Sequence, residues 1–362
     1  MHLTPTQAMR RALELAKRGP ERGPNPRVGC VLLAPGGDEP RAVLGEGWHR
    51  GAGTAHAEAA ALADARVRGV DARGGTAVVT LEPCAHTGRT GPCVDALLDA
   101  GIGEVVYAVD DPNPAAAGGA ERLRAAGVTV RAGLEAAAAG ELIRVWATPA
   151  RLGRPFVTLK LALTLDGRIA AVDGTSKWIT SPAARAHAHG VRGRVDAIAV
   201  GTGTALADDP ALTARTPEGE LLPEQPLRVV LGTRDLPAQA RLRDDRAPFL
   251  HLRTHDVTAA LAELADRHIH HLLVEGGATV AAAFLRADVV DELHVYLAPL
   301  LLGEGTAAVA PFGVGTLADA RRWRFDAPER LGPDLFLRAR RATKPASTPD
   351  PAPALVPAPE GA

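Results

Sequence analysis

The sequence predicts an α/β protein of two domains. Its 362 residues exceed the usual size of a single domain. Segments with helical and strand periodicity alternate along the chain, which is typical of a sheet covered by helices in a three-layer domain. Between residues 141 and 155 an Ala-rich helical segment gives way to the sequence RLGRP, which indicates the joint. We therefore expect domains over residues 1–147 and 148–343, followed by a disordered Pro- and Ala-rich tail over 344–362.

The composition limits the partners and the compartment that we expect. Hydrophobic residues make up 46% of the chain and aromatic residues only 3%, so the cores must be built mainly from Ala, Val and Leu. The formal net charge of −1 gives no general attraction for nucleic acid. Three cysteines leave no disulfide framework and fit a reducing cytoplasm. We expect no N-terminal leader and no membrane-spanning segment, and therefore a cytoplasmic protein.

The first segments of the chain predict a helix followed by two strands. Residues 4–18 have the spacing of a capped amphipathic helix, and Gly-Pro at 19–20 ends it. The segment PNPRVGCVLL at 24–33 predicts a rigid turn and then a buried strand that includes Cys30. A glycine-rich turn separates this strand from the next one, which ends at His49.

Three potential zinc ligands and one carboxylate lie in two motifs. The sequence HAE contains His56 and Glu58 at the start of an Ala-rich helical stretch, and TLEPCAHTGRTGPC contains Cys84 and Cys93. Zinc favours imidazole and thiolate ligands, and a catalytic site keeps its fourth position for water. His-x-Glu followed by Pro-Cys and a second Cys is the pattern of zinc deaminases that act on nucleobase-like rings. We therefore expect His56, Cys84 and Cys93 to bind one zinc ion.

Glu58 is expected to be the catalytic acid and base of this site. Replacing a ring amine by oxygen needs an activated water, and bound zinc can lower the pKa of its water to about 7. A carboxylate then takes the proton of the water and returns it to the leaving ammonia. Cys93 begins a short predicted helix, where a thiol ionises more easily. The alternative is a closed structural zinc site with His86 as the fourth ligand.

The spacing of the two cysteines differs from the usual deaminase motif. Residues 85–92 separate them, whereas two intervening residues are usual. The longer loop carries His86 and Arg89, which are able to hold substrate. With the proline before Cys84 and the sequence GRT in the loop, this spacing resembles the deaminase half of the bifunctional riboflavin-biosynthesis deaminase–reductases. The resemblance implies a cytidine-deaminase-like three-layer domain.

The resemblance extends to other substrate contacts of the first domain. Asn25 is either a turn residue or an amide that bonds a pyrimidine edge, and the match of PNPRVG to the family favours the second role. His49 is either structural or a substrate contact, and the family places a substrate-contacting histidine there. Asp111 and Asn113 follow the next predicted strand and match the family's ribose- and base-contacting positions.

The second half of the chain contains two glycine-rich turns. A predicted strand enters the sequence GTGT at 201–204, and another enters EGGAT at 275–279. Such turns can cradle phosphate with backbone N–H groups, although turn chemistry alone explains them equally well. The motifs LKLALTLDG, KWIT, GTGT, ADDPALT and VEGG, in this order, resemble the reductase half of the same family. That half is similar in fold to dihydrofolate reductase and uses NADPH.

The resemblance assigns two sets of residues in the reductase half. Its arginines hold the ribose phosphate, because a guanidinium fork suits phosphate geometry. Lys160 and Asp208 are candidates for the proton donor, and the sequence does not decide between them. Leu300 replaces a lysine that is frequent at this position of the family. The expected substrate contacts are Lys160, Ser176, Trp178, Arg192, Asp208, Leu212 and Arg215, and the expected cofactor contacts are Thr180, Gly201, Thr202, Glu275 and Gly277.

The expected protein is therefore a bifunctional, homo-oligomeric enzyme of riboflavin synthesis that uses one zinc ion per chain and NADPH. It deaminates 2,5-diamino-6-ribosylamino-4(3H)-pyrimidinone 5′-phosphate by hydrolysis. It then reduces the ribosyl group to give 5-amino-6-ribitylamino-uracil 5′-phosphate. One alternative is a deaminase of nucleic-acid bases, which the charge balance disfavours. The other is a zinc deaminase whose C-terminal half is a non-catalytic nucleotide-binding module.

His268, His270 and His271 form a second concentration of potential metal ligands. They lie in one strand-like run, where alternate side chains face opposite sides of a sheet. We therefore expect solvated or edge histidines here and no second metal site.

Overall fold

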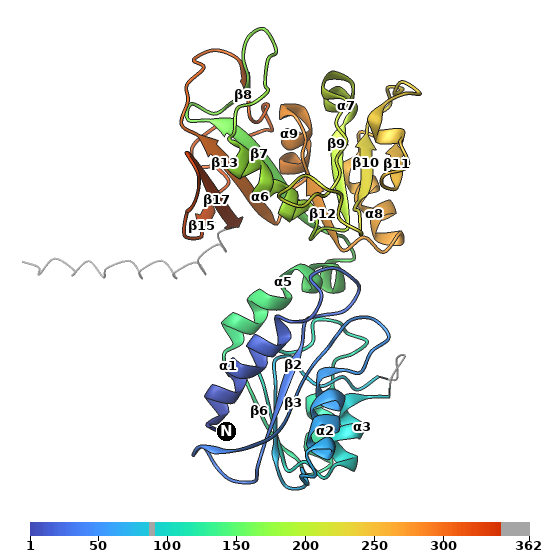
Figure 1. Cartoon of the computed structure of the whole chain (residues 1–362), viewed down its shortest axis with the longest axis vertical. Helices are drawn as coiled ribbons and strands as arrows, with labels where there is room; N and C mark the ends of the chain where they lie inside the picture. The colour runs from blue at the N-terminus through green and yellow to red at the C-terminus, as the bar shows by residue number, and fades with distance from the viewer. Residues whose placement is uncertain (87–90, 342–362) are drawn as a thin grey trace, which may run out of the picture.

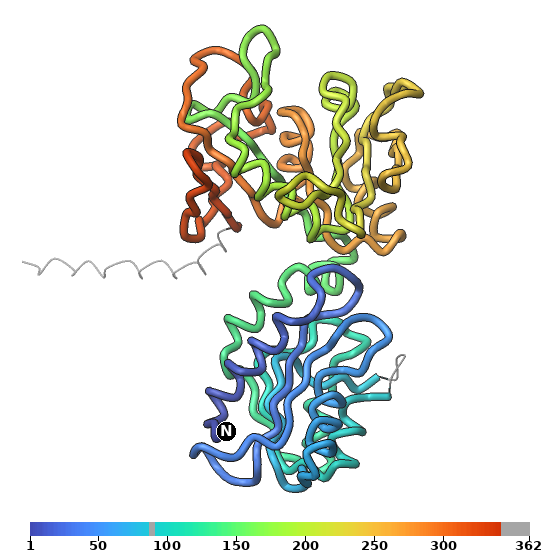
Figure 2. The backbone as a smooth tube through the Cα atoms, in the orientation of Figure 1, coloured from blue at the N-terminus to red at the C-terminus, as the bar shows by residue number. Residues whose placement is uncertain are grey.

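The computed structural model of the chain describes residues 1–86 and 91–341 and consists of two α/β domains (Figure 1). Each domain contains a central sheet covered by helices. Helix α5 (Ala136–Leu152) joins the domains, and the chain crosses between them once, directly after this helix (Figure 2). The predicted α/β class is confirmed.

The N-terminal sheet is mixed, with the strand order β1-β3-β2-β4-β5-β6. Strands β4, β5 and β6 run parallel, whereas β2 pairs antiparallel with β3 and β4. Because parallel neighbours need crossover connections, helices α3 and α4 follow β4 and β5. The elements are β1 (His2–Leu3), α1 (Pro5–Ala16), β2 (Gly29–Leu33), β3 (Arg41–Trp48), α2 (Ala57–Val67), β4 (Thr76–Val79), α3 (Cys93–Asp99), β5 (Glu104–Tyr107), α4 (Gly119–Ala125) and β6 (Thr129–Ala132).

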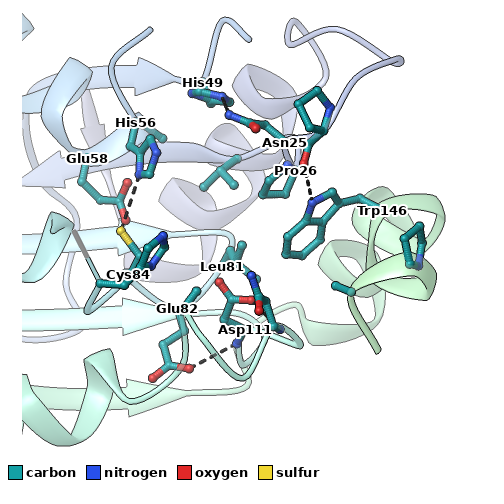
Figure 3. Close-up of a pocket in the computed structure, with 18 of the residues that line it drawn as sticks. Asn25, Pro26, His49, His56, Glu58, Leu81, Glu82, Cys84, Asp111 and Trp146 are labelled. Carbon is teal, nitrogen blue, oxygen red and sulfur yellow. Dashed lines mark hydrogen bonds between the residues drawn. The ribbon is translucent and has the colours of Figure 1, made fainter. Parts of the chain in front are cut away.

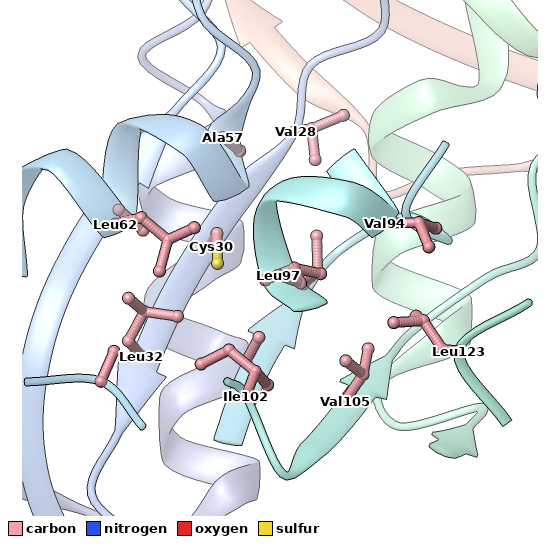
Figure 4. Packing of buried hydrophobic residues seen from close by; sticks show 14 of the residues in the cluster. Val28, Cys30, Leu32, Ala57, Leu62, Val94, Leu97, Ile102, Val105 and Leu123 are labelled. Atoms are coloured by element: carbon pink, nitrogen blue, oxygen red, sulfur yellow. The ribbon is translucent and has the colours of Figure 1, made fainter. Parts of the chain in front are cut away.

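Two hydrophobic clusters cover the two faces of this sheet. Cys30 and Leu32 of β2 belong to the cluster that packs against α2 and α3 (Figure 4). The alternate residues Val31 and Leu33 belong to the cluster that packs against α1. Both faces of β2 are therefore buried, which explains its uninterrupted apolar sequence and confirms the expected buried strand.

Helix α1 begins with a reciprocal capping interaction. The Thr4 backbone N–H donates to Gln7 Oε1 at 2.9 Å, and the Gln7 N–H donates to Thr4 Oγ1 at 3.3 Å. Pro5 occupies the first helical position, where its missing N–H has no cost. The expected amphipathic helix therefore forms, although it ends at Ala16 rather than at residue 18.

The C-terminal domain contains a nine-stranded sheet with the order β11-β10-β9-β12-β7-β13-β17-β15, and β16 pairs with β17. The strands from β11 to β13 run parallel, and β17 runs antiparallel to β13. Its strands are β7 (Phe156–Thr164), β8 (Arg168–Ala170), β9 (Ala197–Gly201), β10 (Leu227–Leu231), β11 (Phe249–Leu252), β12 (His271–Val274), β13 (Glu292–Ala298), β14 (Thr306–Ala307), β15 (Trp323–Phe325), β16 (Glu329–Leu331) and β17 (Asp334–Arg341). Its helices are α6 (Pro182–Arg192), α7 (Thr202–Asp208), η1 (Arg241–Arg243), α8 (Val257–Asp266) and α9 (Ala278–Arg286). Within the described ranges, no helix is long and apolar enough to cross a membrane.

Helix α5 packs in the N-terminal domain and also contacts the C-terminal domain. Its Arg144 forms an ion pair with Glu292 of β13 at 2.8 Å. The expected boundary between residues 147 and 148 falls inside this helix, which continues to Leu152. Gly153 then ends it with a φ of 62°, a conformation that glycine adopts readily. We therefore propose that the domain boundary lies after Leu152.

Candidate active sites

Three side chains from separate elements converge near the N-terminal ends of α2 and α3. His56 precedes α2, Cys84 lies in the loop after β4, and Cys93 is the first residue of α3. His56 Nδ1 lies 3.2 Å from Cys93 Sγ and 3.6 Å from Cys84 Sγ. Ligands of one tetrahedral zinc ion lie about 3.5–4 Å apart, so this group fits zinc. No other group of potential metal ligands occurs among the described residues, and His86 is exposed and outside this one.

The proton affinities of these three ligands depend on one another. A hydrogen bond from Cys93 lowers the pKa of the Cys84 thiol, and the same contact raises the pKa of the Cys93 thiol. Hydrogen bonding with Cys84 raises the pKa of His56. The Cys93 backbone N–H also donates to Cys84 Sγ at 3.4 Å. A metal cation displaces such protons when it binds, because its ligands must be deprotonated.

Glu58 lies in the first turn of α2, beside the metal-binding group (Figure 3). Its side chain is buried, and burial raises the pKa of Glu58 to about 7. A carboxyl group with a pKa near neutrality can both accept and return a proton.

The buried carboxylate of Glu82 connects the segment after β5, including the start of α4, to the metal-binding loop, which carries Cys84. Glu82 accepts hydrogen bonds from the backbone N–H groups of Asp111 at 3.1 Å and Ala120 at 2.9 Å. At Gly119 the two segments approach so closely that a Cβ atom would lie 1.7 Å from Pro83 O. The sequence after β5 therefore includes a glycine where α4 packs against the loop that carries Cys84.

A cavity of about 340 Å³ opens beside the metal-binding group (Figure 3). Asn25 Nδ2 lies 2.7 Å from His49 Nε2, and His49 Nδ1 lies 3.1 Å from the carbonyl oxygen of Ala55. His49 thus donates from Nδ1 and accepts from the Asn25 amide at Nε2, which leaves the Asn25 amide oxygen for a ligand. Of the expected contacts, Asn25, His49, His86, Asp111 and Asn113 line the cavity, whereas Arg89 lies outside the described residues.

A second cavity, of about 770 Å³, lies in the C-terminal domain. The Arg192 guanidinium donates to both oxygens of Glu275, at 2.6 and 2.9 Å, and also to the carbonyl oxygen of Thr213 at 3.3 Å. Lys160 Nζ lies 3.6 Å from the Glu275 carboxylate. One carboxylate between two cations leaves a positive wall, which suits an anionic ligand.

Most of the expected reductase contacts line this second cavity. They are Lys160, Ser176, Trp178, Thr180, Arg192, Asp208, Leu212, Arg215, Glu275 and Gly277. Gly201 and Thr202 are not among its lining residues. Gly201 ends β9, and Thr202 Oγ1 accepts a hydrogen bond from Arg234 Nε at 3.4 Å.

Sequence reasoning missed several Arg, Lys and His side chains at the second cavity. Arg185 and His189 lie on the same helix as Arg192, and their spacing of four and three residues places all three on one face. The Arg185 guanidinium lies 4.5 Å from the centroid of the Trp178 ring. This helical spacing was the available signal. Lys177 and Arg241 also line the cavity.

The metal-binding group and its buried acid define the N-terminal domain as a zinc deaminase, fused to a second domain with its own cavity. A family model described as the cytidine and deoxycytidylate deaminase zinc-binding region matches residues 4–109. The model of the RibD C-terminal domain matches residues 155–337. The chain belongs to the RibD family of riboflavin-biosynthesis proteins.

Similar proteins share both domains with this chain. The riboflavin biosynthesis protein RibD of Mycobacterium tuberculosis is 51% identical over 316 residues, which cover 87% of this chain and 90% of that protein. RibD of Escherichia coli K12 is 40% identical, with 91% and 97% covered. A crystal structure of the deaminase–reductase of Thermotoga maritima has 33% identity and a TM-score of 0.81, with 93% and 99% covered. Acinetobacter baumannii RibD, form 1, has 36% identity and a TM-score of 0.82, with 94% and 99% covered.

The family settles the type of enzyme. The chain is a bifunctional enzyme with a zinc-dependent deaminase domain and an NADPH-dependent reductase domain. The predictions of the family, of the two domain types and of both cofactors are confirmed.

Proposed function

We propose that the two cavities act in sequence on one pyrimidine ribosyl phosphate. The structure from Thermotoga maritima is described as a diaminohydroxyphosphoribosylaminopyrimidine deaminase and 5-amino-6-(5-phosphoribosylamino)uracil reductase. The N-terminal site would convert the first compound to the second, and the C-terminal site would reduce the ribosyl group of the second to ribityl. The adjacency of buried Glu58 to the group His56, Cys84 and Cys93 is the observation that carries the first step.

In the deaminase step, His56, Cys84 and Cys93 would hold the zinc ion. Zinc, when bound, activates the attacking water. Glu58 would take a proton from that water and return it to the leaving amine, and its buried position next to the ligands supports both transfers.

Asn25 would select the ring by its amide oxygen. His49 orients the amide so that this oxygen faces a ligand, and an oxygen accepts hydrogen bonds only from N–H or O–H groups. A pyrimidine edge that carries an amine offers such donors. Asp111 and Asn113, at the other wall of the cavity, would contact the substrate near its ribose.

In the reductase step, NADPH supplies hydride for the sugar C1′ when it is bound. Glu275 would hold Lys160 and Arg192 in place, and the two cations would face the anionic substrate. Asp208 also lines the cavity, and its carboxylate would accept a hydrogen bond from a sugar hydroxyl. Lys160 and Asp208 both line the cavity, and we propose that one of the two would supply the proton.

We also propose a homo-oligomeric enzyme of the cytoplasm that does not bind nucleic acid. The net charge of −1 supports a protein that does not bind nucleic acid. The three free cysteines support a reducing compartment. Exposed apolar side chains on β15 and β17, Phe325 and Leu335, support association with another copy.

The proposal is tested with purified, zinc-loaded protein and the diaminopyrimidine phosphate, with and without NADPH, followed by mass analysis. We expect ammonia release without NADPH and a further gain of two hydrogens with it. Glu58→Gln should keep zinc and lose deamination by about 10²–10⁴-fold or more, because acid–base catalysis supplies that range. Near-normal ammonia release by the zinc-replete variant would contradict the role of Glu58. Binding of NADPH without its oxidation would instead favour a non-catalytic C-terminal module.

A further inference from the structure

The deaminase cavity has one lining residue from the reductase domain. His270, directly before β12, lines it together with Asn25 and with Trp146 of α5. Every other described lining residue comes from the N-terminal domain or from α5. Figure 3 shows Trp146 and α5 across the cavity from Glu58 and Cys84. His270 and Trp146 also line a smaller cavity together, so the wall formed by Trp146 is shared between the domains.

The backbone of His270 is held firmly at this position. Its N–H donates to the Asp196 carboxylate at 3.0 Å, and its carbonyl oxygen accepts from Phe156 N at 2.7 Å. The other oxygen of Asp196 lies 3.7 Å from Nε of Arg22, which belongs to the N-terminal domain. Charge pairing across the interface thus fixes the segment that presents His270 to the cavity.

The imidazole of His270 is available to a ligand. It makes no hydrogen bond within the described part of the chain, whereas the neighbouring imidazole of His271 bonds Thr158 Oγ1 at 2.8 Å. His270 is half-buried, so a bound ligand would shield the contact from bulk water.

The charges around the cavity indicate which part of the substrate lies there. The described lining residues include the carboxylates of Glu58, Glu82 and Asp111, but no arginine or lysine. With the reacting ring beside Glu58, an anionic group avoids these carboxylates by lying toward the wall formed by Trp146. His270 offers an N–H donor on that wall, and hydrogen bonds to phosphate are among the stronger ones in proteins.

We propose that His270 of the reductase domain binds the 5′-phosphate of the deaminase substrate. This inference rests on the proposed deaminase function and adds a specificity residue to it. The reductase half then contributes to the first reaction as well as to the second.

The test uses the full-length, zinc-loaded protein with two substrates, the ribosyl phosphate and its dephosphorylated form. His270→Ala should raise KM for the phosphorylated substrate by about 10-fold or more, because a hydrogen bond to a charged group is lost. The kcat for deamination should change little, since His270 lies away from the reacting atoms. The dephosphorylated substrate should show the same KM for wild type and variant.

Two further variants separate this contact from a structural effect. His268→Ala changes an exposed histidine of the same segment that does not line the cavity, and it should leave the deaminase KM unchanged. His270→Gln keeps an N–H donor and should recover part of the affinity. For all three variants the reductase KM for NADPH should equal that of wild type.

An unchanged KM of His270→Ala for the phosphorylated substrate would overturn the proposal. So would an equal rise in KM for both substrates, because the contact would then not involve the phosphate. Failure of the wild-type protein to release ammonia from either substrate would instead overturn the proposed deaminase function, and this inference with it.

Discussion

Arg192 of α6 and Glu275, next to the end of β12, form a two-point ion pair between residues that are 83 positions apart. Burial raises the pKa of Glu275, but the charges of Arg192 and then Lys160 outweigh it and lower the pKa to about 2. Glu275 is therefore ionised at neutral pH. Its single charge holds two cations at the wall of the reductase cavity.

Removing that charge should impair the reductase selectively. Glu275→Gln leaves Arg192 and Lys160 without a counter-charge, so we expect NADPH oxidation to fall by about 10²-fold as the site loses its geometry. The free energy of unfolding should fall by about 3 kcal/mol, because breaking a buried pair strands a charge. Glu263→Gln breaks an exposed pair with Arg267 and should change stability by less than about 0.5 kcal/mol. Equal urea-unfolding curves for the two variants would contradict the prediction.

Replacing Asp208 or the adjacent Asp209 by alanine should have different effects on reductase activity. Asp208 lines the reductase cavity, whereas the Asp209 carboxylate accepts a hydrogen bond from Arg241 N at 2.8 Å. Asp208→Ala should reduce NADPH oxidation by about 10²-fold while ammonia release continues, because a misplaced sugar reacts poorly. Asp209→Ala should mainly cost about 1 kcal/mol of stability. Separate assays of ammonia release and NADPH oxidation measure the difference. Normal NADPH oxidation by Asp208→Ala would show that Asp208 has no role in the reductase reaction.

Cys93 should be needed for zinc and Cys30 should not. Cys93→Ser replaces one of three ligands, so we expect weaker zinc binding and loss of deamination with the reductase still active. Cys30 is buried in β2 and is not one of the three ligands, and Cys30→Ala should lower stability by about 1–2 kcal/mol without loss of zinc. Metal analysis after dialysis measures the difference. Stoichiometric zinc in active Cys93→Ser would show that another residue is the ligand.

Gly119 should tolerate no side chain. A Cβ atom at this position would lie 1.7 Å from Pro83 O, so Gly119→Ala must displace either α4 or the metal-binding loop. We expect a loss of at least about 2 kcal/mol in unfolding free energy, together with weaker zinc binding. Gly140→Ala, within α5 and with open space around it, should be neutral or stabilising by about 0.5–1 kcal/mol. Zinc affinity unchanged in Gly119→Ala would contradict this account.

Stability should fall with pH below about 6.5 because of His271. Burial lowers its pKa from 6.5 to about 3, so between these values the unfolded chain binds a proton that the folded protein does not. The free energy of unfolding keeps its full value above pH 6.5. At pH 5, protonation of His271 in the unfolded chain lowers the free energy of unfolding by about 2 kcal/mol. Urea unfolding of wild type and His271→Gln at pH 7.5 and pH 5 isolates it, since other groups titrate alike in both proteins. The same pH dependence in both would argue against this role.

The sequence was most informative where chemistry depends on local spacing. His56 and Glu58 are two residues apart at the start of α2. This spacing was enough to predict that His56 binds the metal and that Glu58 lies beside it. The long insertion between Cys84 and Cys93 did not hide the ligand pattern. The loop folds back so that the N–H of Cys93, the first residue of α3, donates to Cys84 Sγ at 3.4 Å. The predicted ligands accordingly lie together in the structure.

Features that depend on distant segments could not be predicted. The pairing of Arg192 with Glu275 and the bonds from Glu82 to the loop after β5 need the tertiary fold. The expectation of solvated or edge histidines was wrong for His271, whose imidazole is hydrogen-bonded to Thr158. Strand alternation predicts two faces, but not which face the neighbouring elements cover.

Helix α5 constrains how this gene can be divided or recombined. Its Ala139 and Ile143 belong to the hydrophobic clusters of the deaminase domain, while Arg144 reaches the other domain. A breakpoint within the helix would leave each fragment with an incomplete surface. Hybrid chains built from two members of the family should therefore exchange segments after Leu152, and they should keep matching partners for Arg144.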